Sequence, residues 1–126
     1  MKKIIHTLNA PDVIGTYSQG IVSNNLIFTS GQIGIDPLSG ELIKNNFTLE
    51  VKQVLSNLDA ILNEGGSSLK LVIKLNVYII NMNNFSILND VFNKFFNTNP
   101  PARSVVEVSS LPMDAQIEID AIGIVN

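Results

Sequence analysis

The chain is short and mildly acidic: it has 126 residues, of which 45% are hydrophobic and 15% are charged, and its net charge is −3. This length fits one domain spanning residues 1–126, and the scattered placement of only eight Lys and Arg residues argues against a nucleic-acid partner. The absence of cysteine excludes disulfides and thiolate sites, and no stretch approaches the roughly 20 apolar residues of a membrane span, so we expect a cytoplasmic protein.

The first predicted elements are a strand, a turn and a helix. Residues 24–30 have the pattern of a short strand, bounded by Asn-Asn and by Gly31, and residues 36–40 form a turn with Pro and Gly at suitable positions. Residues 47–64 are predicted as an amphipathic helix whose apolar stripe is Val51, Val54, Leu55, Leu58, Ile61 and Leu62. Gly65-Gly66 ends this helix, because glycine adopts the left-handed cap conformation without penalty.

The second half alternates strands with one helix. Residues 70–80 are predicted as an inner strand covered on both faces, because apolar residues occur on both sides of its alternation. A helix follows over residues 84–96, with an apolar stripe of Phe85, Leu88, Phe92, Phe95 and Phe96. Pro100-Pro101 blocks its continuation, and two strands, 104–109 and 115–125, complete the chain.

This order of elements predicts an α+β fold with a mixed sheet and both helices on one face. The other face is partly apolar and needs a cover. A small domain has much surface for its volume, so we expect a partner subunit to bury that face. The alternative is a monomer with a few exposed apolar residues, which is common.

Arg103 is the first candidate functional residue. It follows Pro100-Pro101-Ala102, which restrict the local backbone, and it opens a strand. A guanidinium in a half-buried place needs an anion, and its fork matches a carboxylate with two hydrogen bonds. The alternatives are a surface Arg or a structural ion pair with Glu107 or Asp120.

Glu118 is the second candidate. It lies with Gln116 and Asp120 on one face of the last predicted strand, where Ile122 and Ile124 make the continuation apolar. A carboxylate beside apolar neighbours can have a raised pKa and act as an acid or base. The alternative is that this face of the strand is simply solvated.

Other candidates rest on weaker patterns. Tyr17 lies in a glycine-flanked loop and is either a positioned ring or a packing residue; Ser30 and Gly31 end a strand and form either a ligand-approach point or an ordinary turn. Asn89 interrupts the apolar stripe of the second helix. Phosphate-binding loops, dinucleotide fingerprints and zinc-protease motifs are absent, and a single His argues against a metal site, so a site without cofactor remains.

Five segments together resemble the Rid (reactive-intermediate deaminase, YjgF-type) family over essentially the whole chain. They are Asn9-Ala10-Pro11, Ile14-Gly15-Thr16-Tyr17-Ser18-Gln19-Gly20, Phe28-Thr29-Ser30-Gly31-Gln32-Ile33, Pro101-Ala102-Arg103-Ser104 and Ile117-Glu118-Ile119-Asp120-Ala121. The resemblance implies a chorismate-mutase-like fold with the last strand inside the sheet. It also implies a homotrimer with an inner β-barrel and clefts between subunits.

The resemblance further implies an enzyme that hydrolyses 2-imino and enamino acids to 2-keto acids and ammonia. Arg103 matches the residue that grips the substrate carboxylate, and Glu118 the residue that orients the attacking water. Tyr17 matches a residue that closes over the ligand, and Ser30, Gly31 and Asn89 match residues that contact it or line the cleft.

Three positions depart from the family pattern: Val105 replaces a frequent Cys, Thr16 replaces a frequent Pro, and the loop carrying Pro100 is shorter. These departures leave open a non-catalytic carboxylate-binding or regulatory trimer. The resemblance also leaves open RNA cleavage or translation inhibition. The net charge of −3 argues against RNA cleavage or translation inhibition, because RNA is a polyanion.

Overall fold

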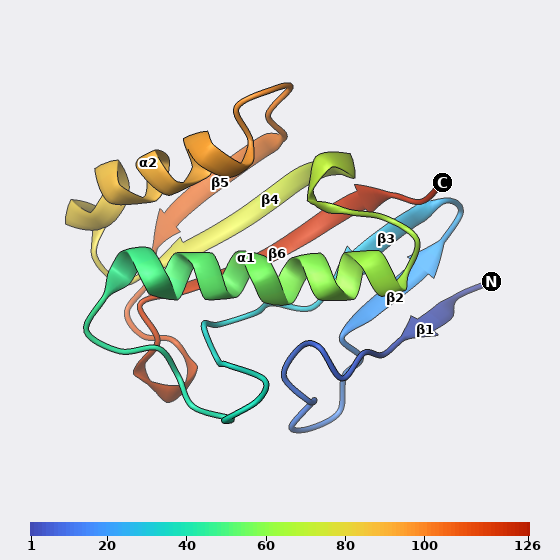
Figure 1. Ribbon diagram of the computed structural model, residues 1–126, viewed down its shortest axis with the longest axis horizontal. Helices are drawn as coiled ribbons and strands as arrows, with labels where there is room; N and C mark the ends of the chain where they lie inside the picture. The colour runs from blue at the N-terminus through green and yellow to red at the C-terminus, as the bar shows by residue number, and fades with distance from the viewer.

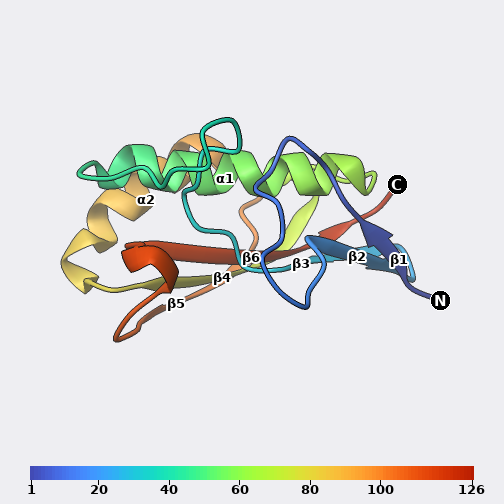
Figure 2. The same cartoon turned by 90° about the horizontal axis from the view of Figure 1, so that it is seen from below.

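Two helices lie side by side on one face of a six-stranded sheet, and the opposite face has no comparable cover (Figures 1 and 2). The computed structural model describes residues 1–126, and it confirms the predicted α+β class. The strands and helices are β1 (Lys3–Ile5), β2 (Gly20–Ser23), β3 (Leu26–Thr29), α1 (Phe47–Glu64), β4 (Val72–Ile79), α2 (Phe85–Phe95), β5 (Ala102–Glu107) and β6 (Ile117–Ile124). Short 3-10 turns span Leu69–Leu71, Met82–Asn84 and Pro112–Asp114.

The sheet has the strand order β1-β2-β3-β6-β4-β5. Strands β4 and β5 are parallel, and every other neighbouring pair is antiparallel. Helix α2 forms the crossover that a parallel pair requires. The last strand lies between β3 and β4, as the family resemblance implies, so residues from the end of the chain sit in the middle of the sheet.

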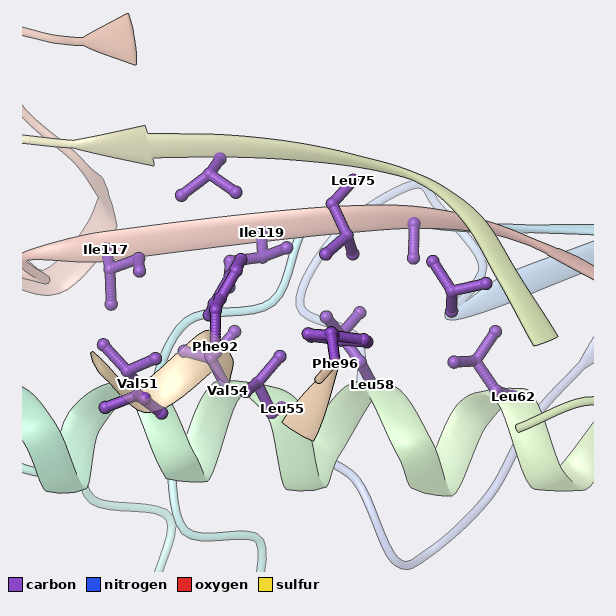
Figure 3. Close-up of a cluster of buried hydrophobic side chains, with 14 of the residues drawn as sticks. Val51, Val54, Leu55, Leu58, Leu62, Leu75, Phe92, Phe96, Ile117 and Ile119 are labelled. Atoms are coloured by element: carbon purple, nitrogen blue, oxygen red, sulfur yellow. The ribbon is translucent and has the colours of Figure 1, made fainter. Parts of the chain in front are cut away.

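Helix α1 spans the predicted range. The Asn46 side chain caps it by accepting a hydrogen bond from the Leu49 N–H at 3.0 Å, and Gly66 follows it in the left-handed conformation with φ of 84°. All six residues of the predicted stripe are fully buried against the sheet and α2, as Figure 3 shows for most of them. The apolar stripe of α1 is therefore part of the hydrophobic core between the helices and the sheet.

The predicted strand 24–30 is only partly correct. Strand β3 begins at Leu26, because Asn24 and Asn25 have φ of 51° and 64° and form the tight turn of a hairpin with β2. The short strands β1 and β2 carry no periodic pattern long enough to mark their bounds.

Strand β4 differs from its predicted alternation. A register irregularity between Val72 and Lys74 reverses the side-chain phase, so Val72 is buried and Ile73 is 42% exposed. Residues 69–71 form a 3-10 turn rather than strand. The sequence predicts that β4 is covered on both faces, but within one chain the helices cover only one face of it.

The remaining bounds shift by small amounts. In α2 the buried residues are Leu88, Val91 and Phe92, whereas Phe85 and Phe95 of the predicted stripe lie 36% and 39% exposed. Strand β5 begins two residues earlier than predicted, so Arg103 lies within it. Strand β6 is two residues shorter at its start and one at its end. Neither α1 nor α2 has the combination of length and hydrophobicity that a membrane-spanning helix requires.

Candidate active site

Arg103 lies on edge strand β5 and faces helix α2. It pairs with Leu75 of β4, whose buried side chain marks the helix-covered face of the sheet. Its Nη1 donates a hydrogen bond to Asn89 Oδ1 at 2.9 Å. Its Cζ lies 5.6 Å from the ring centroid of Phe85 and 5.5 Å from that of Phe92, within the range of cation–π attraction.

These three α2 residues hold the guanidinium in one place. Phe85, Asn89 and Phe92 are spaced by four and three residues, so they lie on one face of the helix. Neither ion pair considered from the sequence forms, because Glu107 accepts from the Met82 N–H and Asp120 accepts from Asn76. Arg103 is exposed rather than half-buried, and most of its N–H donors are free to meet an anion.

The cavity beside Arg103 measures about 290 Å³. Its wall is formed by α2, the two prolines before β5 and the sheet, through the residues Leu75, Asn89, Phe92, Asn93, Phe96, Pro100 and Pro101. A guanidinium at an open cavity with this mixed lining can bind a small carboxylate with its fork.

A second cavity, of about 530 Å³, contains the other four candidate residues. Tyr17, Ser30, Gly31 and Glu118 line it together, although they come from three distant parts of the chain. The rest of its wall is Pro11, Asp12, Ile14, Gln32, Ile33, Ile35, Pro112 and Met113. The sequence therefore identified residues that the fold brings together, but it did not identify the apolar wall around them.

Glu118 is the titratable group of this second cavity. It is half-buried on β6, on the face of the sheet away from the helices. Burial raises its pKa above the ordinary value of 4.5, and the negative charge of Asp120 raises the pKa further. A raised pKa brings a carboxylate closer to the range in which it accepts and returns protons efficiently near neutral pH.

Gly31 makes the position of Glu118 possible. A Cβ on Gly31 would lie 2.7 Å from Oε2 and 2.8 Å from Cδ of Glu118. The two residues approach because the next residue, Gln32, exchanges two backbone hydrogen bonds with Ile119, of 2.9 and 3.0 Å. The absence of a side chain at position 31 thus gives the carboxylate its room.

Ser30 and Tyr17 are held by their own loop contacts. The Ser30 hydroxyl donates to the Ser18 carbonyl at 2.5 Å, so its oxygen can act toward a ligand only as an acceptor. The Tyr17 hydroxyl accepts from the Ile14 N–H at 3.3 Å. Tyr17 belongs to a loop that the buried Gln19 side chain ties down through bonds to Thr7 and Pro11. Ser30 follows β3, and its N–H donates to the Gln19 carbonyl at 2.9 Å.

The two cavities lie on opposite faces of the sheet. Leu75 pairs with Arg103 on one side and with Ala121 on the other, so all three side chains point toward the helices. Glu118 is three positions from Ala121 on the same strand and points the other way. One chain therefore cannot present Arg103 and Glu118 to the same small molecule.

Some functional features were not visible in the sequence. Phe85 and Phe92 were assigned to the core stripe of α2, whereas they also flank the guanidinium. Pro112 and Met113 lie in a connecting turn that gave no signal beyond its proline. No group of three or more His, Asp or Glu residues lies together in a way that could hold a metal ion.

Comparisons with known proteins agree with this architecture. The family model described as endoribonuclease L-PSP matches residues 7–125. A RutC family protein of Pyrococcus horikoshii is 49% identical over 123 residues, covering 98% of each chain. A Bos taurus protein named 2-iminobutanoate/2-iminopropanoate deaminase is 40% identical, covering 98% of this chain and 90% of its own. A solved Rid-family structure from Yersinia pestis is 44% identical and superposes with a TM-score of 0.96, covering 99% of this chain and all of its own.

Proposed function

Because this chain belongs to the endoribonuclease L-PSP family, which includes the proteins named Rid, we propose that it is a hydrolytic deaminase of 2-imino and enamino acids. Its substrates would be small reactive species such as 2-aminoacrylate, 2-iminobutanoate and 2-iminopropanoate. The observation that carries the proposal is the guanidinium of Arg103, seated on α2 with most of its donors unused. The Bos taurus relative's name supports this choice of substrate class.

The chemistry requires positioning and proton transfer, without a cofactor. Arg103 would hold the substrate carboxylate through its fork, and Asn89 would keep the guanidinium in place. Glu118 would accept a proton from water as its oxygen adds to the imine carbon, and it would return that proton to the nitrogen. The C–N bond then breaks as the proton of the new hydroxyl is transferred to the nitrogen, so that ammonia leaves and the carbon becomes the carbonyl of a 2-keto acid.

The site would be completed by a second copy of the chain. Since Arg103 and Glu118 face opposite sides of the sheet, the Arg103 side of one subunit must meet the Glu118 cavity of another. The uncovered face supports such an assembly, because it presents large apolar side chains of which Ile4, Phe28, Val106 and Ile124 are each at least 40% exposed. We propose a cytoplasmic homotrimer of chorismate-mutase-like form, with these faces packed as an inner barrel.

The direct test supplies the purified protein with enamine released from serine or threonine by a dehydratase, and follows the formation of keto acid. We expect acceleration over buffer that Glu118→Gln removes. The wild-type rate should fall as the pH decreases through the pKa of Glu118, which lies above 4.5, because protonation removes the base. Absence of acceleration would reject the deaminase and leave a carboxylate-binding trimer, whose binding of keto acids would still require Arg103.

Substitution at Gly31 gives a steric test of the same site. Gly31→Ala is expected to lower kcat by roughly tenfold to a hundredfold, because its Cβ would force the Glu118 carboxylate to move and small misplacements are costly. Gly40→Ala serves as the control, since a Cβ at that exposed turn meets no neighbour. The φ of 76° at Gly40 makes this control the more strained backbone of the two. If Gly31→Ala kept wild-type kcat, Glu118 would not be acting from its present position.

The name of the family model also raises RNA cleavage. The net charge of −3 and the absence of Lys, Arg and His from the Glu118 cavity argue against binding a polyanion there. RNA cleavage that survives Glu118→Gln and Arg103→Ala would belong to a different surface of the protein.

A further inference from the structure

A second buried carboxylate, which the proposed reaction does not use, lies near the start of α1. Glu50 is only 1% exposed, and it is four residues beyond the capping residue Asn46. It forms no ion pair, since the single ion pair of the chain joins His6 and Asp12. A buried carboxylate without a cation partner lowers the stability of the fold unless hydrogen bonds compensate. The presence of Glu50 at this buried position therefore needs a physical reason.

The compensation comes from the amino end of β6. The Gln116 N–H donates to Glu50 Oε2 at 2.8 Å, and the backbone N–H of Ile117 also favours the charged carboxylate. Burial raises the pKa of Glu50 above its ordinary value, and the backbone N–H groups of Gln116 and Ile117 offset only part of that rise. The partial positive charge of the α1 N-terminus also favours an anion here. Glu50 is thus an anchor between α1 and the segment that leads into β6.

The anchored segment leads directly into the candidate site. Gln116 and Ile117 immediately precede Glu118. Before them, Met113 and Asp114 have φ of 57° and 58°, in the left-handed region, which is unfavourable for Met. Met113 lines the Glu118 cavity, so the Glu50 anchor lies between two residues of that cavity.

Glu50 also contacts a second segment of the wall of that cavity. A Cβ on Gly34 would lie 2.8 Å from Glu50 Cγ and 3.0 Å from its carbonyl oxygen, so the strand-like segment at Gly34 packs directly on this residue. The neighbours of Gly34, Ile33 and Ile35, both line the cavity. One side chain therefore supports two segments that enclose Glu118.

We infer that Glu50 is a positioning residue for the deaminase reaction, which fixes the Glu118 carboxylate by holding the residues before β6 against α1 and Gly34. The inference rests on the proposed function. Glu50 does not touch the cavity that holds Arg103, so its effect should fall on the step that needs Glu118 and not on carboxylate capture.

The kinetic test compares Glu50→Gln and Glu50→Ala with two controls. The amide of Gln has one acceptor oxygen where the carboxylate has two, so we expect kcat to fall severalfold in Glu50→Gln and about tenfold or more in Glu50→Ala, with KM within twofold. Glu64→Gln makes the same chemical change at an exposed position of α1, and Leu62→Ala destabilises the fully buried far end of that helix. Both controls should keep wild-type kcat at a temperature where they are folded.

A loss of kcat in Leu62→Ala equal to that in Glu50→Ala would show that any destabilisation has this effect, and would overturn the inference. Unchanged kcat in Glu50→Gln and Glu50→Ala would overturn it as well. If Glu50→Ala does not fold, the comparison of Glu50→Gln with Glu64→Gln decides.

Hydrogen exchange provides a measurement that does not depend on the reaction. The Gln116 N–H has the Glu50 carboxylate as its partner, so its exchange should accelerate by at least tenfold in Glu50→Gln, whereas exchange within β5 should not change. If the wild type shows no deaminase activity but Gln116 responds in this way, the proposed function fails and the anchor remains. If the enzyme is active and Gln116 exchange is unchanged, the inference about Glu50 fails alone.

Discussion

Replacing Arg103 by alanine is expected to lower kcat/KM for imino acids by roughly a thousandfold. Two charge-assisted hydrogen bonds to a carboxylate contribute about 4 kcal/mol together, and each 1.4 kcal/mol corresponds to a factor of about ten. Arg103→Lys keeps the charge but loses the planar fork, so it should fall between alanine and the wild type. The measurement is keto-acid release from dehydratase-generated enamine over a range of substrate concentrations.

The fold should tolerate this change, because Arg103 is exposed on an edge strand and the one hydrogen bond of its side chain is to the Asn89 side chain. Lys94→Ala, which removes an exposed cation from α2 outside the cavity, is the matched control and should leave kcat/KM unchanged. If Arg103→Ala kept wild-type kinetics, Arg103 would not bind the substrate carboxylate in the mechanism, and the argument for imino acids would fail.

The second large effect is a gain of activity on mixing two inactive variants. Homomers of Arg103→Ala and of Glu118→Gln should each be nearly inactive. When equal amounts are unfolded and reassembled together, about a quarter of the clefts should combine an intact Arg103 from one subunit with an intact Glu118 from its neighbour. Activity should therefore recover to about a quarter of the wild-type value, measured per cleft.

The control for mixing is Arg103→Ala reassembled with a chain that carries both substitutions. Every cleft then lacks Arg103, so no activity should return although mixed oligomers form. If verified mixed oligomers of the single variants also stayed inactive, the two residues would not serve one cleft from different chains, and the reading of the two sheet faces would be wrong.

The long helix could be predicted to its end residues, whereas the short strands could not. Helix α1 carries six apolar residues at regular spacing, a capping Asn46 and a terminating glycine pair, so each part of its sequence indicates the same element. Strands β1 and β2 have three and four residues and are defined by the strand beside them. The irregularity at Val72 likewise depends on pairing with β6, which no local pattern reveals.

The candidate site shows the same division between local and long-range information. Spacing alone placed Glu118 on the strand face that carries Gln116 and Asp120 without showing whether that face is solvated, and α2 spacing placed Asn89 on an otherwise apolar face. That Arg103 and Glu118 lie on opposite faces follows only from the strand order and register, in which β4 separates β5 from β6. The sequence also could not show that Phe85 and Phe92 flank a guanidinium, since a helical stripe does not identify which strand it meets.

The opposed directions of Arg103 and Glu118 have a consequence for how this protein responds to its own abundance. A single subunit would present Arg103, which binds the carboxylate, on one face of its sheet and Glu118, the base, on the other face. Specific activity should then fall on dilution below the dissociation constant of the assembly, and return on concentration. A cell that makes little of this chain would have less deaminating capacity than a linear count of molecules suggests.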